Sequence, residues 1–530
     1  MNHLQPWSSD LPAVGPGEVP APEFVLEHAA RFGDKPALVD GPTGRTLTYR
    51  QLADGVERVA AGLAARGFGR GDVLALSSPN LPEYAIALYG AMAAGGAVTA
   101  ANPLLTAGEL AGQLTDAGAS LLVTVPPFLD TARAAAEKAG VGEVLVFGEA
   151  AGATPFRTLA ADDHPPASPA IDPARDRAAL PYSSGTTGLP KGVELTHANL
   201  VANARQSQGA IGFTAEDVVV GVAPFFHAIG QNLILPCSLR VGATVVTMPR
   251  FDFAGFLELV QRYRATATVV VPPIMLALAG HPLVDDYDLS SLRFLGCGAA
   301  PLGAEVEQRC ADRLGCPVAQ GFGMTEGAAT FAIAPLDAPR RGSAGRLLGG
   351  TQARIVDPGG GGDLGPGRTG ELWLRGPQVM RGYRNHPEAT ARTIDPDGWL
   401  RTGDLCYLDA DGHLFVVDRL KELIKYKGAQ VAPAELEQLL CAHPAVADAA
   451  VVPRPDPEAG ELPVAYVARR ADVDAAELQA WVAERVAPYK RLRDVRFVDQ
   501  VPRSPTGKLL RRTLVEAERA DAGRAPVVVR

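Results

Sequence analysis

The chain has 530 residues, of which 47% are hydrophobic and 21% are charged, and its formal net charge at pH 7 is −9. This length argues for more than one domain, and the composition is normal for a soluble globular protein. A mildly acidic balance gives no sign of nucleic-acid or anionic-membrane binding, although it allows local basic pockets for phosphates.

The first 150 residues alternate between helix and strand signals. Thr48 and Gln51 form a candidate capping box, and the apolar residues from Leu52 to Leu63 then recur at helical spacing. A second helix is expected from about Pro82. Short apolar runs predict strands at residues 73–76, 97–98, 121–125 and 144–147. This alternation predicts an α/β fold whose strands are mostly parallel and buried.

Residues 84–108 carry no charge and are long enough to cross a bilayer. The stretch is nevertheless interrupted by Gly95-Gly96 and by Asn102-Pro103. We therefore interpret it as a buried helix followed by a buried strand.

The second part of the chain begins after a connecting loop at residues 162–176, which is rich in Pro, Ala and Asp. Further strands are expected at 218–220, 243–248, 268–271 and 292–295. Beyond residue 340, strands at 353–356 and 371–375 flank a Gly/Pro loop and predict a smaller β-rich subdomain. From Leu420 onward we expect a compact α+β segment.

The six cysteines include no CxxC pair, and the closest two, Cys310 and Cys316, have no histidine at zinc-ligand spacing. We interpret them as reduced thiols of a cytoplasmic protein. The first twenty residues lack the basic region and apolar run of a signal peptide.

Residues 182–192 read Tyr-Ser-Ser-Gly-Thr-Thr-Gly-Leu-Pro-Lys-Gly, with four Ser/Thr hydroxyls, three glycines and one lysine. Glycines let backbone N–H groups approach an anion, hydroxyls add donors and can reach a metal ion, and lysine adds a positive charge. The spacing is not that of a Walker A loop. By composition alone the segment could equally be a flexible surface loop.

The order of these residues resembles the signature loop of the adenylate-forming superfamily, which contains acyl-CoA ligases, luciferases and adenylation domains. Within it the chain is most similar to 4-coumarate:CoA ligases and related aryl- and acyl-CoA ligases. Seven further segments resemble family motifs in the family's order: Pro224–His227, Gly298–Leu302, Gln320–Glu326, Gly370–Gly376, Trp399–Asp404, Asp418–Gly428 and Pro502–Lys508.

The resemblance implies an enzyme that activates a carboxylic acid with Mg²⁺ and ATP as an acyl-AMP and passes the acyl group to CoA. Lys508 is expected to bridge the acid and the nucleotide, and Thr187 and Glu326 to bind Mg²⁺. The expected ATP or AMP contacts are Ser183, Ser184, Gly185, Thr186, Thr187, Gly188, Lys191, Ala299, Gln320, Gly321, Phe322, Thr325, Asp404, Arg419 and Gln430. Asp404 suits the ribose hydroxyls because an ionised carboxylate only accepts hydrogen bonds.

For thiol transfer, the resemblance implies that a mobile C-terminal domain (419–530) rotates against the N-terminal domain (1–418) about a hinge at Lys421. Lys425 joins Lys508 and His227 among the expected catalytic residues, with His227 gating the tunnel to the acyl-AMP. The expected CoA contacts are Arg250, Lys427 and Gly428.

The expected acyl pocket contains Ala228, Ile229, Gln231, Asn232, Gly296 and Gly323. It departs from the coumarate ligases at Ile229, where a tyrosine usually contacts the phenol. Ile229 offers no hydrogen bond to a para-hydroxyl, so weak discrimination for a phenol is expected. Gln231 or Asn232 could serve a different polar substituent.

Three alternatives remain open from the sequence. The acceptor could be a carrier protein instead of CoA, and the activated group could be a non-carboxylate such as nitrite. A non-enzymatic nucleotide binder is disfavoured because Lys191, Glu326, Asp404 and Lys508 are all present. The expected partners are small molecules, with neither nucleic acid nor membrane.

Overall fold

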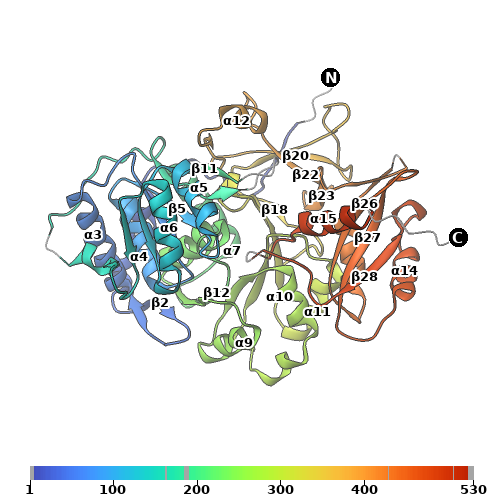
Figure 1. The fold of residues 1–530 in the computed structure, drawn as a ribbon, viewed down its shortest axis with the longest axis horizontal. Helices are drawn as coiled ribbons and strands as arrows, with labels where there is room; N and C mark the ends of the chain where they lie inside the picture. Colours follow the sequence, from blue (N-terminus) through green and yellow to red (C-terminus); the bar gives the residue numbers. More distant parts are fainter. Residues whose placement is uncertain (1–4, 162–163, 184–189, 428, 505–506, 523–530) are drawn as a thin grey trace.

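The computed structural model describes residues 5–161, 164–183, 190–427, 429–504 and 507–522. Within these ranges the chain forms a large N-terminal domain with two nine-stranded sheets, a β-rich region and a separate C-terminal domain, and each of the last two has a five-stranded sheet. Figure 1 shows the first large sheet at the left, the second at the bottom, the β-rich region at the top and the C-terminal domain at the right.

The first large sheet has the strand order β10-β11-β9-β5-β4-β6-β7-β8, and β21 pairs with β11. Its strands are β4 (Val73–Ser77), β5 (Ala97–Ala101), β6 (Ala119–Thr124), β7 (Glu143–Val146), β8 (Thr154–Pro155), β9 (Arg177–Ala179), β10 (Tyr182–Ser183), β11 (Lys191–Thr196) and β21 (Gly382–Tyr383). The helices that cover it include α3 (Tyr49–Ala65), α4 (Pro82–Ala93), α5 (Ala107–Ala117) and α6 (Leu129–Ala139).

Alternate residues of these strands point to opposite faces of the sheet. Leu74 and Val123 pack with α3 and α4, whereas Ala75 and Leu122 pack with α5 and α6. Strands β4 to β7 are parallel neighbours, which confirms the predicted alternation of helix and strand. The capping box is also confirmed, since the Thr48 side chain accepts from the Gln51 amide and the Gln51 side chain accepts from the Thr48 amide.

The second large sheet has the order β18-β17-β16-β15-β14-β12-β13-β2-β3. Its six consecutive strands β16, β15, β14, β12, β13 and β2 are parallel. Its strands are β2 (Pro36–Asp40), β3 (Thr46–Thr48), β12 (Val218–Gly221), β13 (Thr244–Thr247), β14 (Ala267–Val270), β15 (Phe294–Cys297), β16 (Val318–Phe322), β17 (Ala332–Ile333) and β18 (Arg346–Leu347). Strand β15 begins two residues later than predicted because the Leu292 amide closes a turn on the Leu289 carbonyl, although the Leu292 side chain is buried.

Further helices of the N-terminal domain are α1 (Ala21–Leu26), α2 (Ala29–Phe32), α7 (His197–Ile211), α8 (Leu235–Val241), α9 (Phe253–Arg262), α10 (Pro272–Gly280), α11 (Ala304–Leu314) and α12 (Pro387–Thr393). The predicted buried helix and strand in residues 84–108 correspond to α4 and β5, both of which are buried. Among the described residues, no helix combines the length and apolarity needed to cross a membrane. All six cysteines are free thiols.

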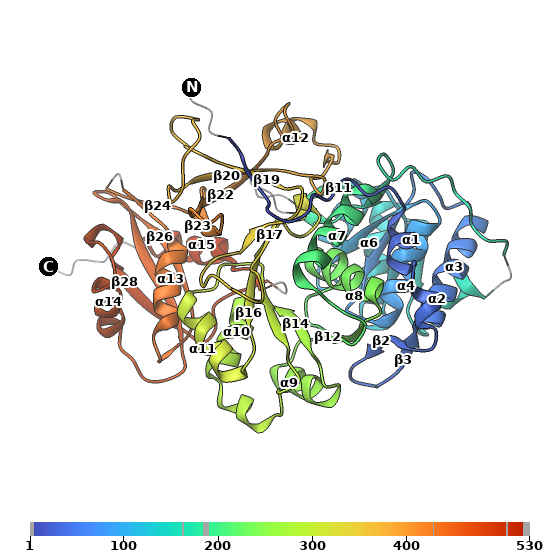
Figure 2. The ribbon, with the colours of Figure 1, turned by 180° about the vertical axis from the view of Figure 1, so that it is seen from behind.

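The β-rich region is an antiparallel sheet of β1 (Trp7–Ser8), β19 (Gln352–Val356), β20 (Gly370–Arg375), β22 (Leu400–Leu408) and β23 (Leu414–Arg419). The C-terminal sheet contains β24 (Ile424–Tyr426), β25 (Ala429–Val431), β26 (Val446–Asp456), β27 (Gly460–Arg469) and β28 (Asp494–Val498), with α13 (Pro433–Ala442), α14 (Ala475–Ala483) and α15 (Arg511–Ala522). This domain has its own apolar cluster. It meets the N-terminal domain where α13 contacts α11 and β26 contacts α10 (Figure 2).

Candidate active site

A cavity of about 500 Å³ opens where the second large sheet, the β-rich region and the C-terminal domain meet. The carboxyl ends of β14, β15 and β16 form one wall, because parallel strands all end at the same edge of their sheet. The predicted site residues that line it are Ser183, Lys191, His227, Ala228, Ile229, Gly296, Ala299, Gln320, Gly321, Phe322, Gly323, Thr325, Glu326, Arg419, Lys421 and Lys508. Residues from segments far apart in the sequence thus converge on one space.

Other predicted residues lie elsewhere. Asp404 is buried next to Arg419 at the margin of the cavity. Lys425, Lys427, Gln430 and Arg250 are exposed and do not line the cavity. Ser184, Gly185, Thr186, Thr187, Gly188 and Gly428 lie outside the described residues.

The β-rich region supplies a carboxylate and a guanidinium. Strands β22 and β23 pair with each other in a register that places Asp404 directly opposite Arg419. Arg419 Nε therefore lies 3.1 Å from Asp404 Oδ1. Burial raises the pKa of Asp404 to about 6, although the charge of Arg419 opposes the shift. Above that pH the carboxylate is ionised and can accept hydrogen bonds from hydroxyl groups.

A second carboxylate, Glu326, lies in the 3₁₀ turn η5 (Thr325–Gly327) after β16 and is 2% exposed. The Tyr383 hydroxyl donates to its Oε1 at 2.8 Å. Lys191 Nζ lies 5.5 Å from the centroid of the same tyrosine ring. The pairing of β11 with β21 brings Lys191 and Tyr383 together, and no local pattern in the sequence indicates this role for Tyr383.

The C-terminal domain inserts Lys508 into the cavity. Enclosure by protein and the charge of Arg419 lower the pKa of Lys508, while Glu326 and Asp404 oppose the shift. Burial and the charge of Arg419 lower the pKa of Lys421 as well. Cations fixed in a partly desolvated site are suited to stabilising a negatively charged transition state.

The segment Gly298–Leu302, which contains the expected nucleotide contact Ala299, is bonded to β16 through the Gln320 side chain. The Gln320 side chain accepts from the Leu302 amide at 2.9 Å and donates to the Leu302 carbonyl at 3.0 Å and to Glu307 Oε2 at 2.6 Å. Ala299 in this loop has φ = 72°, a left-handed conformation that is uncommon for a residue with a Cβ. The Gln320 side chain therefore holds the loop that presents Ala299 to the cavity.

His227 also lines the cavity, where burial and the charge of Lys508 lower its pKa to about 3, so its imidazole is neutral at pH 7. Its Nδ1 accepts from the Ile229 amide at 3.4 Å, which leaves the proton on Nε2. Many of the other residues that line the cavity are apolar, among them Ile211, Leu233, Val269, Phe294, Ala329 and Ile333.

Gln231 and Asn232, which are expected in the acyl pocket, are not among the residues that line this cavity. Both are buried, and the Asn232 amide donates to the Ala328 carbonyl at 2.8 Å. The chain forms a π-helical turn (Ile229–Ile234), in which Ile229 and Leu233 face the cavity and the two amides face away from it.

One further cluster of potential metal ligands occurs among the described residues, at Asp409, Asp411 and His413. Arg340 lies within 3.4 Å of Asp409 and 3.5 Å of Asp411, so the acidic charge is already compensated by a protein cation. Asp409 Oδ1 also accepts from the amides of Asp411 and His413, which is the arrangement of a tight turn.

Comparison with known proteins agrees with this geometry. Residues 25–384 match the family model of the AMP-binding enzymes, and residues 435–508 match that of the AMP-binding enzyme C-terminal domain. The chain is 43% identical to 4-coumarate–CoA ligase 2 of Nicotiana tabacum over 523 residues (96% of each chain) and 42% identical to 4-coumarate–CoA ligase of Pinus taeda over 537 residues (97% of each).

Among solved structures, the anthranilate CoA ligase AuaEII in complex with anthranoyl-AMP matches with a TM-score of 0.89 and 26% identity, covering 97% of this chain and 99% of that one. A benzoate CoA ligase from Burkholderia xenovorans LB400 matches with a TM-score of 0.85 and 28% identity, over 94% and 100%. The chain belongs to the family of AMP-binding enzymes.

Proposed function

We propose that the chain activates a hydrophobic carboxylic acid with ATP as an acyl-AMP and then transfers the acyl group to CoA, releasing AMP and pyrophosphate. The observation that carries the proposal is that one cavity is lined both by the charged side chains of Lys508, Arg419 and Glu326 and by many apolar side chains. The names of the similar CoA ligases from Nicotiana and Pinus point the same way.

The nucleotide roles follow from the chemistry of each group. Lys191 and Ser183, together with the loop that follows Ser183, bind the β- and γ-phosphates. Asp404 accepts hydrogen bonds from the ribose hydroxyls, and Arg419 supports the ribose and phosphate region. Lys508 contacts the acid and the nucleotide together and offsets the negative charge that accumulates as the carboxylate attacks the α-phosphate.

Glu326 is suited to Mg²⁺ because carboxylate oxygens are the ligands that this ion prefers, and the Tyr383 hydrogen bond orients the carboxylate. Thr187 and Glu326 would hold the ion. When bound, Mg²⁺ neutralises the pyrophosphate leaving group.

The apolar end of the cavity supports an aryl or cinnamate-like acid without a para-hydroxyl group. Ile229 lines this wall and has no hydrogen-bonding group, so a phenol there would lose its water without gaining a partner. His227 lines the same cavity as Lys508, and in the proposed mechanism its neutral imidazole gates access to the acyl-AMP.

We propose that the chain works as two domains, 1–418 and 419–530, that rotate about Lys421 between the two half-reactions. Lys425, Lys427 and Gln430 are exposed and do not line the cavity that Lys508 enters. This supports a second orientation in which the face that bears these three residues meets the cavity. CoA would then contact Arg250, Lys427 and Gly428. Six free thiols support a reducing compartment such as the cytoplasm.

A pyrophosphate-release screen with Mg-ATP tests the proposal across benzoates, cinnamates, aminoaryl acids, medium-chain fatty acids and nitrite, each with and without CoA. We expect release with an unsubstituted aryl or cinnamate-type acid and a CoA thioester by mass spectrometry. Turnover that ignores CoA would indicate another acceptor such as a carrier protein. Turnover only with nitrite and an aryl amine would indicate a diazotising enzyme.

A further inference from the structure

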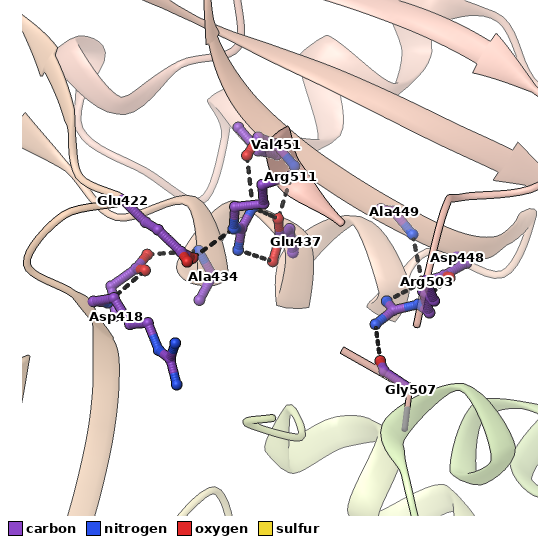
Figure 3. A network of polar contacts seen from close by, with 11 residues as sticks. Asp418, Glu422, Ala434, Glu437, Asp448, Ala449, Val451, Arg503, Gly507 and Arg511 are labelled. Atoms are coloured by element: carbon purple, nitrogen blue, oxygen red, sulfur yellow. Dashed lines mark hydrogen bonds and ion pairs between the residues drawn. The ribbon is translucent and has the colours of Figure 1, made fainter. Parts of the chain in front are cut away.

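The loop that carries Lys508 is held to the C-terminal sheet by the side chain of Arg503. Arg503 donates from Nε and from one terminal nitrogen to the two carboxylate oxygens of Asp448 on β26, each at 2.8 Å. Its other terminal nitrogen donates to the Gly507 carbonyl at 2.9 Å (Figure 3). One guanidinium thus joins β26 to the peptide unit that precedes Lys508.

The loop itself is tight. The Ser504 amide donates to the Lys508 carbonyl at 2.8 Å, and the Gly507 amide donates to the Ser504 carbonyl at 2.8 Å. The Lys508 amide donates to the Ser504 hydroxyl at 3.2 Å. The backbone on both sides of Lys508 is therefore fixed by hydrogen bonds, and its side chain keeps only its own rotations.

Gly507 also fits closely against the N-terminal domain. Gly507 has φ = 76°, and a Cβ on it would approach the Val271 side chain to 2.7 Å. A small displacement of the loop would therefore either collide with the end of β14 or withdraw Lys508 from the cavity.

The Arg503–Asp448 pair has the chemistry of a rigid anchor. The two side chains are 19% and 15% exposed, and the Asp448 carboxylate also accepts from the Ala449 amide at 2.9 Å. Paired parallel hydrogen bonds to a carboxylate fix direction as well as distance, which a lysine cannot do. Although burial alone lowers the pKa of Arg503, the hydrogen bonds and charge of Asp448 raise it. Neither residue lines the cavity.

We propose that Arg503 is a positioning residue for the acid-activating step, acting through the Gly507 carbonyl to aim Lys508 into the cavity beside Glu326. The inference rests on the proposed function, because the role of Lys508 belongs to it. It also gives a specific expectation: thiol transfer uses the other face of the domain, so Arg503 matters for the first half-reaction only.

The experiment compares Arg503→Met with Arg454→Met in the full-length protein. Arg454 lies on β26, the strand that carries Asp448, and pairs with Asp494 at 2.7 Å, so the control removes an ion pair from the same domain but not from the Lys508 loop. Two rates are measured: formation of acyl-AMP from acid and Mg-ATP in a single turnover, and formation of thioester from synthetic acyl-AMP and CoA.

Arg503→Met is expected to slow acyl-AMP formation on the order of 10- to 100-fold, the loss typical of a catalytic group misplaced by about 1 Å. Thioester formation from synthetic acyl-AMP is expected to stay within about twofold of wild type, as is the KM for ATP, because the pocket itself is unchanged. Asp448→Asn should give the same split, and Arg503→Lys should recover part of the rate.

Wild-type acyl-AMP formation in Arg503→Met would overturn the inference. Equal loss of both half-reactions, with Arg454→Met unaffected, would also overturn it, because that pattern indicates a merely structural role. Failure of the proposed function looks different, since the wild-type protein would then form no acyl-AMP with any acid.

Discussion

Asp404 gives the most quantitative prediction, because a buried carboxylate with a pKa of about 6 changes charge in an accessible range. If the ionised form binds ribose hydroxyls, the dissociation constant of a ribose ligand scales with 1 + 10^(pKa − pH). That factor is close to one at pH 8 and about 11 at pH 5. Adenosine is the suitable probe, because its lack of phosphate keeps the ligand's own titration out of the measurement.

The same shift predicts an opposite effect on stability. The folded-state pKa lies above the unfolded value of about 3.9, so the folded protein favours the protonated carboxyl. The stabilisation is fully present below about pH 4 and is lost as the pH rises through 6. At about 1.4 kcal/mol per pKa unit, the ionised carboxylate costs about 3 kcal/mol of unfolding free energy at pH 8.

Both effects are measured with wild type and Asp404→Asn. Calorimetric titration with adenosine from pH 8 to 5 should show the affinity falling in wild type and a flat, weak profile in the variant. Without ligand at pH 8, the variant should unfold at a higher temperature. The reasoning is refuted if adenosine affinity in wild type does not change over this range, or if both proteins show the same slope.

Three further substitutions test other parts of the site. Lys508→Ala should sharply slow acyl-AMP formation while leaving thioester formation from synthetic acyl-AMP largely intact; equal loss in both assays would contradict the assignment of Lys508 to one step. Tyr383→Phe removes a hydrogen bond from the buried Glu326 carboxylate, worth about 1.5–3 kcal/mol, so pyrophosphate release should slow by about tenfold or more; an unchanged rate across a Mg²⁺ titration would remove Tyr383 from the site. Ile229→Tyr should raise the ratio of kcat/KM for 4-coumarate over cinnamate by about tenfold, the value of one hydrogen bond; an unchanged ratio would mean that this wall does not meet the para position.

Much of the fold could be predicted from local patterns. The capping box at Thr48 and the buried strands at 73–77 and 97–101 depend on signals within a few residues, and these signals agree with the packing around them. The motif residues could be expected as a set because their segments resemble family motifs in the family's order. Residues of β14, β15 and β16 reach the cavity because the carboxyl ends of parallel strands share an edge, whereas Arg419 and Lys508 reach it from the β-rich region and the C-terminal domain.

The remainder depends on contacts between distant segments. Gln231 and Asn232 face away from the cavity because the chain forms a π-helical turn there. The polar residues of this short segment do not predict such a turn. Tyr383 bonds to Glu326 across 57 residues, and Arg503 bonds to Asp448 across 55 residues. Single residues of these types occur throughout any chain, so their roles become visible only when their partners are known.

The cations that line the cavity come from different parts of the chain. Lys191 comes from the N-terminal domain, Arg419 from the edge of the β-rich sheet, and Lys508 from the C-terminal domain. Desolvation together with the positive charge of Arg419 lowers the pKa of Lys508, while Glu326 and Asp404 oppose the shift, so a bound polyphosphate would add to the anions that favour the charged lysine. Its conversion to departing pyrophosphate removes most of that added charge. In the proposed two-domain cycle, loss of the polyphosphate would therefore weaken the hold on Lys508 after the first half-reaction, when the other face of the C-terminal domain is proposed to meet the cavity.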